Sequence, residues 1–242
     1  MPTPRLRDSR RALTHELYPL GQIPDSIVKR LGAYIVYLLA AGRDDLTGDE
    51  FGDAFAYAID GTHLKSPVGI ADVVYDNQAW SCKTVKKANP FTGNVVRLIS
   101  GRCSPDYSYG IENPHDDLQA TGTAVLGIWN ERINIARDHY NPVRTVILVR
   151  SEDMSSFCIY EEDNYRYATN EYIWKENRQN NLIGVKGEKT CFTWQPHGSQ
   201  FTIHSDMPSN AIKFKVRKPH SISKEQIWDA VGFDESWIEI ID

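Results

Sequence analysis

Long hydrophobic runs are missing from this sequence of 242 residues. The longest, AYIVYLLAA at positions 33–41, is far shorter than the roughly 20 apolar residues that a membrane-spanning helix needs. The first residues include several arginines but no apolar core of the kind found in secretion signals. We therefore expect neither a membrane span nor a secretory leader.

Cysteine is also scarce, and the four cysteines are scattered along the chain. None of them forms a CxxC pair; they are Cys82, Cys103, Cys158 and Cys191. This distribution argues against a zinc site and is typical of proteins whose thiols stay reduced. We expect a cytoplasmic protein.

Excess positive charge is the third feature that the sequence lacks. Acidic residues outnumber basic ones, 32 to 27, and the formal net charge is -5. A simple nucleic-acid coat protein would be basic, so any DNA role must depend on a local positive surface. The hydrophobic fraction of 41% is enough for a core, and the length suits a single domain covering 1–242.

The order of secondary-structure signals predicts an α/β protein with a mixed central β-sheet flanked by helices. A Gly- and Pro-rich stretch is expected to form a long loop at 89–116, and 174–184 is interpreted as a surface helix end. Helices are predicted over 24–42, 47–61 and 116–140, and strands within 143–150, 156–163, 190–203 and 211–219.

The most informative stretch lies between the second and third helices and is expected to form a β-hairpin. It reads SPVGIADVVYDNQAWSCKTVKKANPF, with a two-residue turn at 76–77. That turn predicts that Val73 pairs with Trp80. Because side chains alternate along a strand, Asp72, Ser81 and Lys83 should then share one face.

Each strand of this hairpin carries one charged residue inside an apolar run. Partly burying a carboxylate and an ammonium is costly, so the pair of Asp72 and Lys83 calls for an explanation. A carboxylate can bind Mg²⁺, which polarises a phosphate and activates water. A neighbouring lysine can orient that water or stabilise the transition state. The alternative interpretation is a structural ion pair.

Asp72 followed by SCK at 81–83, between an upstream helix and a long downstream helix, resembles the PD-(D/E)XK nuclease superfamily. Type II restriction endonucleases are its best-known members. The resemblance covers about 45–160 and implies a restriction-endonuclease-like core. Two positions depart from the family pattern: Ala71 replaces the proline, and Ser81 replaces the second acidic residue.

Some members of the superfamily with serine at that position supply the missing carboxylate from a helix. We favour Glu50 as this second metal ligand, because it lies on the helix before the hairpin. Glu50 also has the spacing of a capping-box partner for Thr47, and the two interpretations remain open. The other candidates are Asp53, Glu112 and Glu131.

Two groups of side chains could contact DNA. Basic residues downstream of Lys83 could hold phosphates, although a mobile basic loop is the alternative. One of them, Arg102, could instead reach a guanine edge. Amide, imidazole and hydroxyl groups crowd a Pro/Gly turn and could read base edges, although an ordinary polar turn is equally consistent. The first group is Lys86, Lys87, Arg97 and Arg102; the second is Gln195, His197, Ser199 and Gln200.

The resemblance implies a Mg²⁺-dependent, site-specific endonuclease that cleaves double-stranded DNA and leaves 5′-phosphates. It further implies a homodimer and a cognate DNA methyltransferase in the same system. In this interpretation Asp72 and Glu50 bind the metal, Lys83 and Ser81 complete the catalytic set, and 164–242 contributes DNA recognition. Two alternatives remain: a structure-directed repair or recombination nuclease, and a non-catalytic DNA-binding protein.

Overall fold

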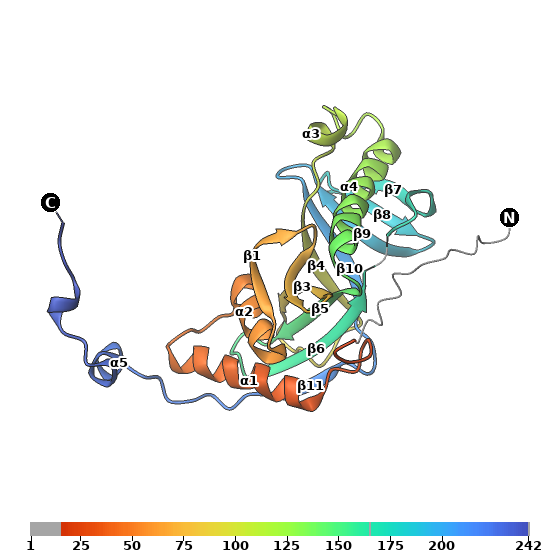
Figure 1. Cartoon of the computed structure of the whole chain (residues 1–242). Helices are drawn as coiled ribbons and strands as arrows, with labels where there is room; N and C mark the ends of the chain where they lie inside the picture. The colour runs from red at the N-terminus through yellow and green to blue at the C-terminus, as the bar shows by residue number, and fades with distance from the viewer. Residues whose placement is uncertain (1–15, 165, 242) are drawn as a thin grey trace, which may run out of the picture.

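Two β-sheets share one long helix, α4, in the computed structural model, which describes residues 16–164 and 166–241 (Figure 1). The helices are α1 (Asp25–Ala40), α2 (Gly48–Ile59), α3 (Pro105–Tyr109), α4 (Leu118–His139) and α5 (Lys224–Val231). The strands are β1 (Thr62–Val68), β2 (Ala71–Tyr75), β3 (Gln78–Lys86), β4 (Val95–Arg102), β5 (Val143–Arg150), β6 (Ser156–Asp163), β7 (Ile173–Glu176), β8 (Leu182–Lys186), β9 (Lys189–Gln195), β10 (Gln200–Asp206) and β11 (Ile212–Lys215).

The three helices predicted from the sequence are confirmed. Pro24 is the N-cap of α1, and α2 begins with a capping box in which the Thr47 hydroxyl accepts from the Glu50 amide. The carboxylate of Asp117 caps α4 by accepting a hydrogen bond from the Ala120 amide. These local signals fix the helix starts without help from distant residues.

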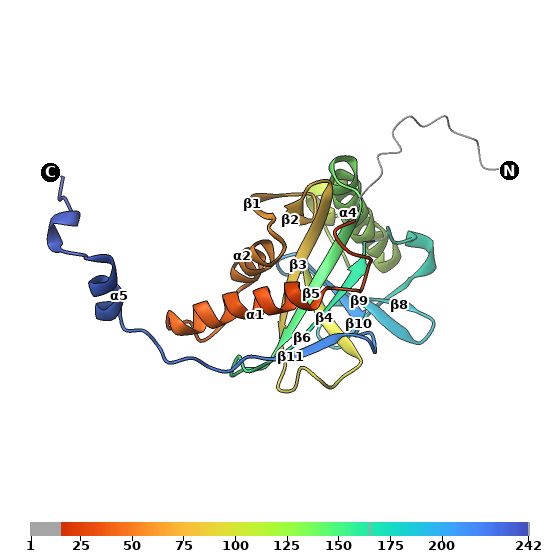
Figure 2. The same ribbon diagram turned by 60° about the horizontal axis from the view of Figure 1, so that its bottom comes forward.

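The larger sheet is the predicted mixed sheet, with strand order β1-β2-β3-β5-β6-β11. β3 and β5 run parallel and are joined through α4, and the other neighbouring pairs are antiparallel. Every residue of β5 is buried, including the polar Arg144, Thr145 and Arg150, as expected for a central strand covered on both faces. Helices α1 and α2 pack on one face of this sheet and α4 packs on the other (Figure 2).

The second sheet, β4-β10-β9-β8-β7, corrects two predictions. Residues 89–116 do not form one long loop, because they contain β4, which pairs antiparallel with β10, and the short helix α3. The segment 174–184 is not a helix end, because it forms the hairpin of β7 and β8. The partner of β4 lies about a hundred residues further along the chain, outside the first segment, whereas β7 and β8 pair with each other within the second.

The β2–β3 hairpin has the predicted turn and register. Val73 pairs with Trp80, and Tyr75 pairs with Gln78. Asp76 takes the left-handed conformation, φ 48°, that tight hairpin turns require. The side chains of Val73 and Trp80 enter the core beneath α1 and α2, which leaves the opposite face to Asp72 and its neighbours.

Two expectations from the sequence concern membrane-spanning helices and the cysteines. Within 16–164 and 166–241, no helix combines the length and apolarity needed to cross a bilayer. All four cysteine thiols are free, and burial raises the pKa of the Cys103 thiol to about 11. The cysteines are therefore unpaired, as their spacing predicted.

The turn between β1 and β2 packs directly against α4. Gly69 has φ +65°, and a Cβ added there would lie 2.2 Å from the Arg132 carbonyl oxygen. We expect Gly69→Ala to lower the free energy of unfolding by about 2–4 kcal/mol, measured by urea denaturation, because it combines backbone strain with a clash. Gly187→Ala is the matched control, since Gly187 has φ +62° with open space around it. Equal losses in the two variants would contradict the close packing.

Candidate active site

The carboxylate of Asp72 lies at the fork where β2 separates from β3. Its Oδ2 atom accepts hydrogen bonds from the Ser81 hydroxyl at 3.2 Å and from the Cys82 amide at 2.8 Å. The Lys83 ammonium lies 3.5 Å from the same oxygen. Asp72, Ser81 and Lys83 therefore share one face of the hairpin, as the register predicted.

The side chains of Asp72 and Lys83 are partly buried. Their side chains are 21% and 22% exposed, so the ion pair is shielded from bulk water yet reachable by a ligand. Three donors meet at Oδ2, whereas Oδ1 has no hydrogen bond to any described residue. The arrangement fixes the orientation of the carboxylate and leaves one oxygen available for a metal ion.

A basic cleft of about 410 Å³ opens beside Lys83. One wall is the outer half of β3, and the facing wall is the segment Arg97–Ile99 of β4. The first residue of α2, Gly48, closes one end. Three cationic residues, Lys83, Lys86 and Arg97, therefore line one cleft. The sequence predicted Lys86 and Arg97 as phosphate contacts, but it did not place them beside Lys83.

Lys86 and Lys87 each have a partner near this cleft. The Lys86 ammonium lies 3.3 Å from an oxygen of Asp45, and the Lys87 ammonium donates to the Val95 carbonyl at 2.9 Å. The second contact ties together the two ends of the β3–β4 connection. Lys87 therefore shapes the cleft, while Lys86 and Arg97 line it directly.

Glu50, the favoured second metal ligand, is held in the capping box. One carboxylate oxygen accepts from the Thr47 amide at 2.8 Å, and the other accepts from Arg43 Nε at 2.7 Å. Burial alone would raise the pKa of Glu50, but the Thr47 and Arg43 hydrogen bonds outweigh it and lower this pKa. This geometry favours the capping interpretation, and the metal role stays a prediction.

The other three candidate carboxylates have contacts elsewhere. An oxygen of Asp53 lies 2.8 Å from His63 Nδ1, and Glu131 accepts from the side-chain amide of Asn134. Glu112 lines a separate pocket near the turn between β9 and β10. No cluster of three or more His, Cys, Asp or Glu side chains suitable for a metal ion occurs in the described parts of the chain.

The proposed base-reading group lies together at the tip of the β9–β10 hairpin. Gln195 pairs with Gln200, and the Ser199 carbonyl accepts from the Cys103 amide at 2.8 Å. His197 occupies the turn itself. Arg102 pairs with Gln200 across the neighbouring strand, so it belongs with this tip. Along β4, Arg102 is separated from Arg97 in the cleft by about 17 Å at the usual strand rise.

Two charged residues beside the cleft were not identified from the sequence. Asp45 pairs with both Lys86 and Arg150, and Arg150 also donates to the Leu46 carbonyl. Burial would raise the pKa of Asp45, but the Leu46 amide and the two cations outweigh it and lower this pKa. The available signal was Arg150, which directly follows the apolar residues 146–149 of β5.

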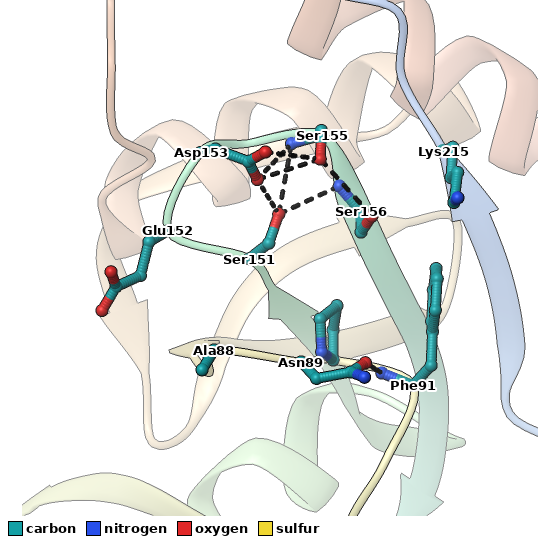
Figure 3. Close-up of a pocket in the computed structure, with 10 residues that line it drawn as sticks. Ala88, Asn89, Phe91, Ser151, Glu152, Asp153, Ser155, Ser156 and Lys215 are labelled. Carbon is teal, nitrogen blue, oxygen red and sulfur yellow. Dashed lines mark hydrogen bonds between the residues drawn. The ribbon is translucent and has the colours of Figure 1, made fainter.

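A larger pocket, of about 480 Å³, lies between the β3–β4 connection, the β5–β6 turn and Lys215 (Figure 3). Its Asp153 carboxylate accepts hydrogen bonds from the Ser151 hydroxyl and from the hydroxyl and amide of Ser155. These bonds lower the pKa of Asp153 to about 2. The hydrogen bonds of this carboxylate therefore stabilise the β5–β6 turn. For this reason we place the candidate active site at Asp72 and not in this pocket.

Comparison of the chain with models of protein families, with curated proteins and with solved structures gave no match.

Proposed function

We propose that this protein is a Mg²⁺-dependent endonuclease of the restriction type, acting on double-stranded DNA with a PD-(D/E)XK core. The observation that carries the proposal is the contact of Asp72 with both Ser81 and Lys83 beside a basic cleft. A structural ion pair alone gives no reason for a cleft lined by three cationic side chains.

The order of the elements supports the same proposal. Helix α2 precedes an antiparallel run of β1, β2 and β3. The connection from β3 to the parallel strand β5 contains β4, α3 and then the long helix α4. The resemblance requires a helix before the hairpin and a long helix after it, and both are present. Asp72 and Lys83 occupy the two strands on which that pattern places its acid and its lysine.

The residues at the fork suit Mg²⁺ when DNA completes the site. Mg²⁺ in proteins is commonly bound by one or two carboxylates together with substrate phosphates and waters. Asp72 Oδ1 supplies one such oxygen, and the Ser81 hydroxyl donates to the other oxygen of the same carboxylate, Oδ2. Glu50 is the proposed second carboxylate, and it can turn toward the metal only by leaving Arg43 and the capping box.

When bound, the metal polarises the scissile phosphate and lowers the pKa of the attacking water. Ser81 and the Cys82 amide hold the Asp72 carboxylate in place. Lys83 orients the water and stabilises the negative charge that develops on the phosphate oxygens. The water oxygen forms a bond to phosphorus while the bond to the 3′-oxygen breaks, which leaves a 5′-phosphate and a 3′-hydroxyl.

Lys86 and Arg97 hold the DNA backbone in the proposed complex. We expect Lys86→Ala with Arg97→Ala to weaken binding of all DNA sequences and to reduce the slope of log K against log[salt] by about 2. Fluorescence anisotropy over a range of salt concentrations measures both quantities. Lys186→Ala, which removes a β8 lysine paired with Glu171, is the control and should change neither. An unchanged slope in the double variant would contradict the phosphate role.

Sequence reading is assigned to the β9–β10 tip and Arg102. A homodimer would present two forks and two tips to a two-fold symmetric site, one fork for each strand. A cognate DNA methyltransferase would protect the host copies of that site.

A non-catalytic DNA-binding protein is the second candidate. The observation that favours it is the single carboxylate at the fork, since residues 16–164 and 166–241 contain no group of three or more His, Cys, Asp or Glu side chains that could hold a metal ion. Such a protein would keep the cleft and its phosphate contacts but would not hydrolyse DNA.

One experiment separates these functions: incubation of unmethylated plasmid and phage DNA with the protein in Mg²⁺, with EDTA as the blank. Discrete fragments with 5′-phosphates support the restriction activity, and a smear supports a structure-directed or nonspecific nuclease. DNA binding without cleavage in Mg²⁺ or Mn²⁺ supports the non-catalytic candidate. A protein that neither binds nor cleaves DNA would leave Asp72 and Lys83 as a structural pair.

A further inference from the structure

The C-terminal segment 219–241, which we name the arm, extends away from the rest of the protein (Figures 1 and 2). Its helix α5 begins with a capping box between Ser223 and Gln226, so the helix is encoded locally. Every residue of α5 is exposed. A helix this short has little stability of its own in water and normally depends on packing against a partner.

The arm exposes an unusual amount of apolar surface. On α5, Ile227, Trp228 and Val231 are 40%, 46% and 54% exposed, and large apolar residues continue beyond it. The rings of Trp228, Phe233 and Trp237 lie in sequence at centroid distances of 5.6 and 5.7 Å, which gives the arm one continuous aromatic face. A surface of this kind usually marks an interface.

A complementary groove of about 320 Å³ lies between α1 and β11. Its lining is mainly apolar and includes Val28, Val36 and Phe214. Lys29 and Arg217 add positive charge at this groove. The arm is acidic: one lysine, Lys224, stands against five carboxylates, at Glu225, Asp229, Asp234, Glu235 and Glu239. The arm and the groove therefore match in both apolar character and charge.

The path of the chain before α5 determines whether the arm can reach the groove of its own copy or that of a second copy. The Ile222 amide donates to the Ala40 carbonyl, at the last residue of α1, before α5 begins. The groove lies further back, along residues 28–36 of the same helix. The arm of one copy is therefore carried past the end of α1 and away from its own groove (Figure 2).

We propose that the arm docks in the α1–β11 groove of a second copy of this chain. Two α1 helices lying antiparallel across a two-fold axis bring the exit point at Ala40 close to the partner groove, since α1 is only about 24 Å long. Each copy then gives its arm to the other, so the interface closes as a symmetric dimer. The exchange goes beyond the nuclease activity and does not depend on it.

The test is the mass of the protein in solution, measured by sedimentation equilibrium. The full chain should have twice the mass of one chain, and a version ending at Ser223 should be monomeric. The shortened version should still fold, because α5 has no residue buried in its own chain. Its melting temperature should fall only by the stabilisation that dimerisation supplies, and should no longer depend on protein concentration.

Charge reversal provides a second readout that does not depend on truncation. Lys29→Glu with Arg217→Glu should weaken the dimer at least about 10-fold, and Glu225→Lys with Asp229→Lys should do the same. Combining all four substitutions in one chain should restore the dimer. Loss without restoration would overturn the assigned pairing of arm and groove.

Two other results would overturn the proposal. A monomeric full chain would mean that the arm lies free, folds onto its own groove or binds another protein. A dimer that survives removal of the arm would place the interface elsewhere. DNA cleavage is scored separately, so an inactive but arm-dependent dimer would count against the nuclease and not against the arm.

Discussion

Asp72→Asn and Lys83→Ala should each slow DNA cleavage by about 10²- to 10⁴-fold. The first substitution keeps the shape of the side chain but loses the charge that binds the metal, and the second leaves the developing phosphate charge unopposed. Single-turnover cleavage of a linear DNA in Mg²⁺ measures the chemical step. DNA binding should change far less, because the other cationic side chains of the cleft remain.

Two substitutions on nearby strands serve as matched controls. Asp76→Asn removes a carboxylate from the turn of the same hairpin, where asparagine tolerates the φ of 48°. Lys65→Ala removes an exposed lysine from β1. Both should cleave at the wild-type rate. Full activity in Asp72→Asn would contradict the assignment of the site.

Glu161→Ala should lower the free energy of unfolding by about 3–5 kcal/mol, because it removes the buried partner of Arg144 and leaves this arginine paired with Glu16, whose side chain is 45% exposed. The Glu161 carboxylate is fully buried and accepts from Tyr18 Oη and Trp80 Nε1, both at 2.7 Å. Arg144 lies 3.4 Å away. Burial raises the pKa of Glu161, while the bond from Tyr18 and the charge of Arg144 oppose the rise.

Urea denaturation of the Glu161→Ala variant tests this prediction. The control is Glu171→Ala, which breaks an exposed pair with Lys186 and should cost less than about 1 kcal/mol. Similar costs for the two variants would mean that the Glu161 network contributes no more than a surface pair. The network also anchors the segment around Tyr18 to the central sheet, so the larger loss should include loosening of that segment.

The hairpin and the three long helices were predictable because their signals are local. A two-residue turn at Asp76 fixes the register, and the register alone brings Asp72 beside Ser81 and Lys83. Capping residues such as Thr47 and Asp117 mark helix starts in the same local way. The contacts at the centre of the site, between Asp72, Ser81 and Lys83, could therefore be predicted from the sequence.

The surroundings depend on contacts between distant residues. β4 was interpreted as loop because it forms a strand only through β10, about a hundred residues later. The basic cleft requires β4, so Arg97 could not be placed opposite Lys86. The pairing of Glu50 with Arg43 is a different case: the two residues are close in sequence, but whether they meet depends on the irregular path of the α1–α2 connection, which the sequence pattern does not predict.

The central claim is that the Asp72 carboxylate serves metal-dependent cleavage of DNA. The most direct measurement is cleavage of one unmethylated DNA by wild-type protein, Asp72→Asn and Asp76→Asn, side by side in Mg²⁺ and in EDTA. We predict discrete fragments with 5′-phosphates from the wild type and Asp76→Asn in Mg²⁺, and no cleavage in EDTA or by Asp72→Asn. Cleavage that persists in Asp72→Asn, or its absence from the wild type in both Mg²⁺ and Mn²⁺, would contradict the claim.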